Sequence, residues 1–248
     1  MPSPLHKTKG LVLRTIRYGE TSLVVTAFTE LFGVQSYIVS GVRKTSRTGS
    51  GSANLFQPGA LLDLVVYHRA SNSLHRIKEF QWSVLYQELF ASVPKHSVSS
   101  FMVELVHRCL RQPEPHADLF EFVEDCLLHL DASSESVMAN MPLFFALHLA
   151  HFFGFRLVDD RVEAGAWLDL REGRFVSAQP IHPDHLDPHD AQALLQILRV
   201  MNPAELTEVR LHRDIRRRLL DAMERYYRLH QPDFGSLRSL PVLRAVLE

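Results

Sequence analysis

The sequence predicts an α+β protein of two domains, a small β-barrel followed by a helical domain. Short runs rich in Val, Ile, Leu and aromatic residues fill the first 80 residues, and apolar residues at three- and four-residue spacing dominate the remainder. With 248 residues, the chain is long enough for two hydrophobic cores. Its content of 46% apolar and 22% charged residues is typical of a folded globular protein and argues against disorder.

The predicted barrel rests on five strand-like runs that turns containing Gly or Asn separate. The runs are GLVLRTIRY, TSLVVTAF, VQSYIVS, ALLDLVVYHR and SLHRIKEF. Five strands in about 75 residues favour an OB-fold, a partly open Greek-key barrel that binds oligonucleotides. An SH3-like barrel would give a similar pattern. We assign residues 1–81 to this N-terminal five-stranded OB-fold domain.

Residues 82–248 are predicted to form an all-α helical domain with a small hairpin insertion. Apolar spacing predicts three helices in HSVSSFMVELVHRCLRQ, HADLFEFVEDCLLHLD and SVMANMPLFFALHLAHFFGF. The pattern changes over residues 157–187, where AWLDLREGRFV predicts a short hairpin. Helical spacing then returns in AQALLQILRV, in one long helix over residues 203–231 and in the terminal segment SLPVLRAVL.

Basic residues are concentrated at the start of the chain. Residues 1–80 carry ten Lys and Arg against four Asp and Glu, a net charge of +6, whereas residues 81–204 carry −9 and residues 205–248 carry +2. Three of these cations lie in the Ser- and Gly-rich connection SGVRKTSRTGSGSANLFQPG, residues 40–59. A basic domain within a nearly neutral chain is the electrostatic footprint of a polyanion-binding surface.

The candidate nucleic-acid contacts are the cationic side chains of the barrel domain. Cations that neutralise phosphates and aromatic rings that stack on bases are what sequence-tolerant binding of single strands requires. Phe32, Tyr37, Phe56 and Tyr67 are interleaved with the cations, although aromatic residues in a barrel are more often part of the core. The cationic candidates are Arg14, Arg17, Arg43, Lys44, Arg47, Arg69, Arg76 and Lys78.

A second group of arginines lies near the C-terminus, in RLHRDIRRRLL. Acid-before-base pairs four residues apart are predicted to offset part of this charge, each contributing about 0.2–0.5 kcal/mol. The predicted pairs are Asp214–Arg218, Asp221–Arg225 and Glu224–Arg228. The arginines that suit an acidic partner protein or a second phosphate backbone are Arg210, Arg213, Arg216 and Arg217.

The Pro-rich segment IHPDHLDPHD is the strongest enzyme-like feature of the chain. Its His182, His185 and His189 alternate with aspartates, and imidazole and carboxylate groups suit zinc or iron. Two prolines interrupt the helix that would place His185 and His189 on one face. A polar entry to the next helix, with Asp187 or Asp190 near its N-terminus, is the simpler interpretation.

Other signatures of catalysis or targeting are absent from the sequence. It contains neither a G-x-S-x-G motif nor a glycine fingerprint for a phosphate or dinucleotide. Its two cysteines, Cys109 and Cys126, are too few for a four-ligand zinc site and are expected to be buried thiols in a reducing compartment. Neither a signal-peptide core nor a membrane-spanning run occurs. We expect a cytoplasmic protein that is not an enzyme and that holds no cofactor or metal.

Several short motifs follow one another in a characteristic order. The first motif contains a strand, a turn at Tyr18–Glu20, a second strand, a Phe-Gly turn and an exit through Ser40–Arg43. Its sequence is KGLVLRTIRYGETSLVVTAFTELFGVQSYIVSGVRK. LFQPGALLDLVVYHR and LHRIKEFQ complete the barrel, and YYRLHQPDFGSLRSLPVL ends the helical part. In this order the chain resembles the RecO family of bacterial DNA repair and recombination mediators, in the form found in Bacteroidetes.

The resemblance implies binding of single- and double-stranded DNA and annealing of complementary strands. It also implies two partners: RecR, with which the protein helps to load RecA, and the acidic C-terminal tail of single-stranded DNA-binding protein. Many family members carry a four-cysteine zinc module where residues 157–187 of this chain contain no cysteine. We therefore expect no zinc there, and a hairpin packed around Trp167, Leu170 and Phe175.

Two alternatives to a DNA repair mediator stay open. A basic OB-fold barrel suits an RNA-binding protein equally well. A metal-dependent hydrolase built on His182, His185 and His189 is the other alternative. The family interpretation adds that the protein is associated with the nucleoid.

Overall fold

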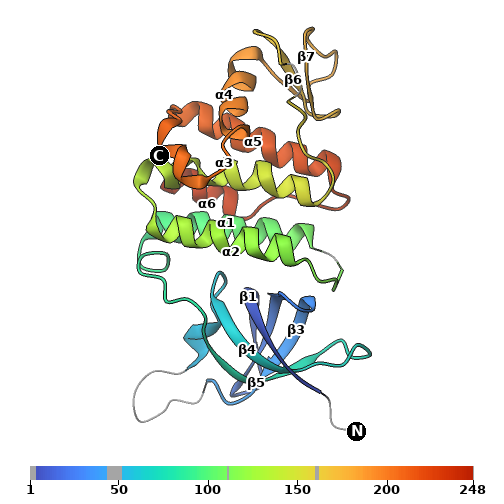
Figure 1. Ribbon diagram of the computed structural model, residues 1–248, viewed down its shortest axis with the longest axis vertical. Coiled ribbons are helices and arrows are strands. Elements are labelled where there is room, and N and C mark those ends of the chain that lie inside the picture. Colours follow the sequence, from blue (N-terminus) through green and yellow to red (C-terminus); the bar gives the residue numbers. More distant parts are fainter. Residues whose placement is uncertain (1–3, 44–51, 111, 160–161, 248) are drawn as a thin grey trace. The chain divides into compact units, whose positions relative to one another are not determined.

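The computed structural model describes residues 4–43, 52–110, 112–159 and 162–247. Residues 1–86 with 110–125 form one compact unit, here called the barrel unit, and residues 87–109 with 126–248 form another, the helical unit. Figure 1 shows a closed barrel in the first unit and packed helices with a small sheet in the second. The predicted α+β fold class is confirmed, whereas the domain boundary after residue 81 stays a prediction.

The barrel unit is a closed sheet with the strand order β1-β2-β3-β5-β4. β5 lies between β3 and β4, running parallel to β3, where Tyr37 pairs with His75, and antiparallel to β4. This is a Greek-key order, as in an OB-fold, and closure removes exposed sheet edges. The strands are β1 (Leu5–Tyr18), β2 (Ser22–Thr29), β3 (Gly33–Val39), β4 (Leu61–Tyr67) and β5 (His75–Trp82), and a short 3-10 helix, η1 (Ser52–Phe56), precedes β4.

A bulge in β1 decides which of its side chains face outward. The register shifts between Val12 and Arg14, so one extra residue enters the strand and its alternation is reversed. Before the bulge, Lys7 lies on the outside; after it, the even-numbered residues Arg14, Ile16 and Tyr18 do. The bulge therefore places two chemically different groups of side chains on the outer surface of one strand.

The helical unit is centred on α3 (Glu135–Phe152). Residues 140–147 are all buried, as the nearly continuous apolar sequence predicts. Tyr227 donates a hydrogen bond of 2.7 Å to the Ala146 carbonyl and so fixes α5 against α3. The other helices are α1 (Val93–Cys109), α2 (Ala117–Ala132), which contributes residues to both units, α4 (Pro188–Leu198), α5 (Arg213–His230) and α6 (Ser239–Val246).

The single helix predicted over residues 203–231 is wrong. The structure divides this segment into a 3-10 helix, η2 (Pro203–Glu208), and α5. His212 has extended backbone angles and caps α5, because its Nδ1 accepts a hydrogen bond from the Asp214 N–H. Asn140 donates to the Val209 carbonyl at 2.8 Å, which satisfies that group outside a helix and stabilises the break.

The predicted hairpin of the helical unit is confirmed and belongs to a three-stranded sheet. Its strands are β6 (Trp167–Asp169), β7 (Arg174–Val176) and β8 (His185–Leu186), in the order β7-β6-β8. Leu168 and Leu170 are fully buried, whereas Trp167 and Phe175 are only half-buried. The predicted packing around Leu170 is thus confirmed. Trp167 and Phe175 are also expected at the centre of the hairpin, but Leu168 is buried there instead.

Candidate nucleic-acid interface

A row of outward-pointing side chains from all five strands runs round the outside of the closed barrel. Directly paired residues on adjacent strands point to the same side of a sheet, so the register defines the row. It runs across β1, β2, β3, β5 and β4. We call this row and its two neighbours on β1 the open face; it consists of Ile16, Val24, Ile38, Arg76 and Tyr67, with Arg14 and Tyr18 beside them.

The open face combines exposed apolar surface with isolated positive charge. Ile16 is 46% exposed and Tyr18 55% exposed. β2 and β3, in the middle of the face, contain no charged residue. Arg14 and Arg76 are exposed on the strands that flank them. Apolar side chains between arginines suit a polymer that presents flat bases and phosphates together.

The β1–β2 turn borders the open face and is held by Arg43. Gly19 adopts a positive φ of 58° in this turn, and its carbonyl accepts a hydrogen bond of 3.1 Å from Arg43 Nη1. The Arg43 N–H also donates to the Thr21 carbonyl at 3.1 Å. Arg17 pairs with buried Leu23 and so belongs to the opposite side of β1 from Arg14, although it is exposed.

Two further cationic candidates, Arg69 and Lys78, lie in or next to the β4–β5 pair. Arg69 follows β4 in the connection to β5, where its carbonyl accepts the Asn72 N–H at 2.9 Å. Lys78 lies at a bulge of β5 and forms an ion pair with Glu79 at 2.9 Å. Lys44 and Arg47 lie outside the described residues. The structure thus places Arg14 and Arg76 on the outside of the barrel, on β1 and β5, and Arg43 and Arg69 in connections between strands.

Two of the four interleaved aromatic residues belong to the core. Tyr37 is 0% exposed and Phe56 is 1% exposed, and burial raises the pKa of Tyr37 to about 12. Phe32 stacks on His68, with ring centroids 3.9 Å apart. Tyr67 alone among the four lies half-buried on the open face.

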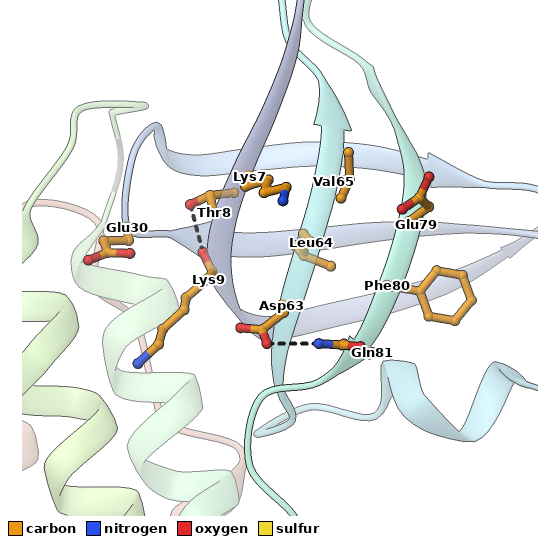
Figure 2. A pocket seen from close by; sticks show the side chains of 10 residues that line it. All are labelled: Lys7, Thr8, Lys9, Glu30, Asp63, Leu64, Val65, Glu79, Phe80 and Gln81. Carbon is orange, nitrogen blue, oxygen red and sulfur yellow. Dashed lines mark hydrogen bonds between the residues drawn. The ribbon is translucent and has the colours of Figure 1, made fainter.

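The outer surface of β1, β4 and β5 has a different character. A hollow of about 550 Å³ lies here, and Figure 2 shows that its side chains carry both signs of charge. Glu30, Asp63 and Glu79 contribute carboxylates. Lys9 is directed towards α2 and pairs with Glu124 at 2.7 Å, which raises the pKa of Lys9. This hollow, which we call the mixed-charge face, is a poor match for a polyanion.

The C-terminal arginines meet in a groove between α5 and α6. Arg213, Arg216 and Arg217 line a hollow of about 190 Å³, and Arg210 precedes it in an exposed position. The other lining residues are Asp214, Leu220, Leu243, Arg244 and Leu247. We call this hollow the arginine groove.

Two arginines of this groove are partly withdrawn from water. Arg216 donates to the Asn140 side-chain oxygen and to the Leu211 carbonyl, both at 3.2 Å, and burial lowers the pKa of Arg216. Burial, together with the nearby charge of Arg217, lowers the pKa of Arg244. Crowded guanidinium groups beside leucine side chains suit an anionic ligand with apolar parts.

Two of the three predicted ion pairs along α5 are wrong. Only Glu224–Arg228 forms, at 3.6 Å. Arg218 instead holds Asp190 of α4 through two hydrogen bonds of 2.6 and 2.7 Å, and Asp221 pairs with Arg244. Residues on other elements lie closer to these side chains than the neighbours one helical turn away.

The histidines of the Pro-rich segment have separate partners. His182 Nε2 lies 3.2 Å from an Asp169 oxygen, and His185 Nδ1 donates to the His182 carbonyl at 2.6 Å. Within the described ranges, the side chains close enough to share a metal ion are Asp187, His189 and Asp190. Asp187 caps α4, and the hydrogen bonds of Arg218 hold the pKa of Asp190 below its usual range. A carboxylate already paired with arginine fits a cation poorly.

Sequence reasoning missed the apolar part of the open face and one residue of the arginine groove. In the sequence, the apolar residues Ile16, Val24 and Ile38 look like core residues of a strand. The alternation of apolar and polar residues does not show which side of a strand is covered by another part of the protein. Arg244 comes from α6, far along the chain from the other groove arginines. In the part of the chain that the structure describes, helices fall short of the length and apolarity that crossing a membrane requires.

Comparison with known proteins agrees with this architecture. Residues 1–86 match the family described as Recombination protein O N terminal, and residues 94–240 match Recombination protein O C terminal. DNA repair protein RecO of Bacteroides fragilis is 34% identical over 249 residues, covering 98% of this chain and 100% of the relative. RecO of Phocaeicola vulgatus is 33% identical, covering 97% and 98%, and RecO of Porphyromonas gingivalis is 28% identical, covering 97% and 98%. The chain therefore belongs to the RecO family of DNA repair and recombination proteins, which are not enzymes.

Proposed function

We propose that this protein binds single- and double-stranded DNA, anneals complementary strands and, together with RecR, helps to load RecA onto DNA coated by single-stranded DNA-binding protein. The observation that carries the proposal is the open face, where five strands align apolar and aromatic side chains between Arg14 and Arg76. The proposal places the protein in the cytoplasm, where it would be bound to the DNA of the nucleoid.

A single strand can use both parts of the open face. Bases stack on Tyr18 and Tyr67 at about 1–3 kcal/mol for each stacked base, Ile16 adds apolar contact, and arginines contact the phosphates. Binding of this kind tolerates sequence, since every base has a flat face. It weakens with salt because each neutralised phosphate releases bound cations.

Annealing requires no bond chemistry. Two strands repel each other through their phosphates, and a cationic surface lowers this repulsion. Contacts to the backbone and to the flat faces of bases leave many base edges free to pair. The uncharged centre of the face, on β2 and β3, adds no acidic group that would oppose a second strand.

The arginine groove is the proposed docking site for the acidic tail of single-stranded DNA-binding protein. Arg213 and Arg217 supply positive charge, while Leu220 and Leu243 supply apolar contact. Carboxylates on a flexible peptide form strong, charge-assisted hydrogen bonds with guanidinium groups. Arg210 and Arg216 belong to the same proposal, and RecR is proposed as a partner without an assigned surface.

An annealing assay on coated strands tests these proposals together. The protein should accelerate annealing of complementary strands coated with intact single-stranded DNA-binding protein, and lose this effect when the acidic tail is removed. On bare strands, where no coating protein is present, it should anneal the strands without the tail. Failure to anneal bare strands, or binding RNA of the same sequence more tightly than DNA, would contradict the proposed function.

A paired variant locates the docking site. The double variant Arg213→Ala with Arg217→Ala should anneal coated strands as poorly as the unmodified protein does when the tail has been removed. Its annealing of bare strands should be unchanged. Arg228→Ala is the matched control, because Arg228 lies on the same helix but does not line the arginine groove. Equal behaviour of the two proteins on coated strands would exclude the arginine groove as the site.

A further inference from the structure

A second hollow lies on the open face, separate from the one that forms the mixed-charge face. About 360 Å³ of space lies beside the β4–β5 connection. Residues from three strands and this connection line it: Ile38, Tyr67, Asn72, Leu74, His75 and Arg76. This volume is at the lower end of the range for small-molecule sites, so the hollow suits a ligand about the size of a single planar ring system.

The walls of the hollow offer apolar, aromatic and polar groups in separate places. Leu74 is 43% exposed in the connection, and half-buried Tyr67 lies opposite Arg76 in the register. Asn72 is exposed, and its Oδ1 accepts a hydrogen bond of 3.4 Å from Ser71. A flat aromatic ligand with hydrogen-bonding edges and a neighbouring negative charge matches this set of side chains.

The wall formed by His75 is rigid and neutral. Gln35 donates its side-chain N–H to the Phe32 carbonyl at 2.8 Å, so its Oε1 is left to accept from His75 Nε2 at 3.1 Å. His75 is 4% exposed and stacks on His68, with centroids 4.3 Å apart. Burial lowers the pKa of His75. A neutral, fixed imidazole adds packing surface without competing with Arg76 for phosphate.

We propose that this hollow holds one nucleobase of a bound single strand, turned out of the base stack, between Tyr67 and Leu74. Asn72 faces the edge of the base, and Arg76 contacts the adjacent phosphate. Taking a base out of the stack costs least in a strand that is already single. The inference rests on the proposed DNA binding and adds a defined anchor point to an otherwise sequence-tolerant surface.

Photochemical crosslinking tests the position of the base. A single strand carrying 5-iodouracil, which crosslinks to aromatic rings stacked on it, should form an adduct at Tyr67 on irradiation. Tyr67→Phe should keep the adduct and Tyr67→Leu should lose it, while both still bind the strand. Adducts at Tyr18 without any at Tyr67 would overturn the inference and leave the proposed function intact, whereas absence of DNA binding would reject the proposed function itself.

Affinity gives a second, independent readout. The unmodified protein should bind oligo(dT) more tightly than an abasic strand of equal length. Asn72→Ala with Leu74→Ala should reduce this preference about tenfold, the scale expected for one stacked base, with affinity for the abasic strand unchanged. Ser73→Ala, in the same connection but outside the lining, is the matched control. If the double variant kept this preference and still bound DNA in a salt-dependent way, the proposed base site in the hollow would be wrong and the proposed DNA binding would stand.

Discussion

The two outer faces of the barrel use the same strand, β1, in opposite ways. Before the bulge, Lys9 projects onto a surface that carries several carboxylates, and its ammonium group forms an ion pair with Glu124. After the bulge, Arg14 projects onto a surface whose central strands carry no charge. The number of cations is similar, so their count does not distinguish the faces. What distinguishes them is the supply of nearby carboxylates.

Apolar residues on the strands of the barrel also differ in what covers them. Phe28 is fully buried, with its ring 5.3 Å from that of Phe120 in the same unit, whereas Ile16 stays 46% exposed. Apolar surface left open next to arginines is a feature of ligand-binding surfaces. The following predictions test this contrast, beginning with the largest expected effect.

Removing a covered apolar side chain should cost far more stability than removing an exposed one. Phe28→Ala is expected to lower the free energy of unfolding by about 3–5 kcal/mol, because it leaves a cavity. Ile16→Ala should lower it by less than about 1 kcal/mol, since the side chain already contacts water. Urea unfolding followed by circular dichroism measures both. Similar losses would mean that the open face is covered after all.

Removing the arginines of the open face should weaken DNA binding. Arg14→Ala with Arg76→Ala should reduce the slope of log affinity against log salt by about 1.4 for single strands, or about 25-fold in affinity at 0.1 M salt, if each arginine contacts one phosphate. Fluorescence anisotropy with an oligonucleotide over a salt series gives both values. Lys7→Ala on the mixed-charge face is the control, and an equal effect there would remove the distinction between the faces.

Acid should destabilise the barrel unit through the histidines behind the hollow. Burial, and then the charges of His75 and His6, lower the pKa of His68; burial lowers that of His75. The unfolded chain therefore takes up protons first, so stability is complete above about pH 6.5 and falls below it, by at most about 1.4 kcal/mol per pH unit for each histidine. His68→Phe, which keeps a ring on Phe32, should flatten this dependence in urea unfolding at pH 7.5 and 5.5. A dependence equal to that of the unmodified protein would show that His68 does not contribute.

The smallest effect is expected for Lys78. Its ammonium group already pairs with Glu79, and it lies at a bulge outside the row of the open face. Lys78→Ala should change DNA affinity by less than about twofold, whereas Arg76→Ala, two residues away, should weaken it about fivefold at 0.1 M salt. Equal losses in the same anisotropy assay would extend the binding surface across β5 to the mixed-charge face.

Much of the architecture could be predicted because it depends on local patterns. The alternation of apolar residues identified all five strands of the barrel, and helical spacing identified α1, α2 and α3. The excess of positive charge marked the first 80 residues as the candidate binding domain, which stays a prediction. The break before α5 could not be predicted, because the hydrogen bond that satisfies the Val209 carbonyl comes from Asn140, which is distant in sequence.

The residues by themselves determined which segments fold, where the positive charge is concentrated and which family the chain resembles, because periodicity, composition and motif order are properties of the chain alone. Only the tertiary structure decided which cations act together. A one-residue bulge reversed the direction of Arg14, Glu124 of α2 paired with Lys9, and pairing across β3, β4 and β5 brought Arg76 beside Tyr67. Charge and apolar surface become a binding site only when strand register places them on one face, and register depends on contacts between residues far apart in the sequence.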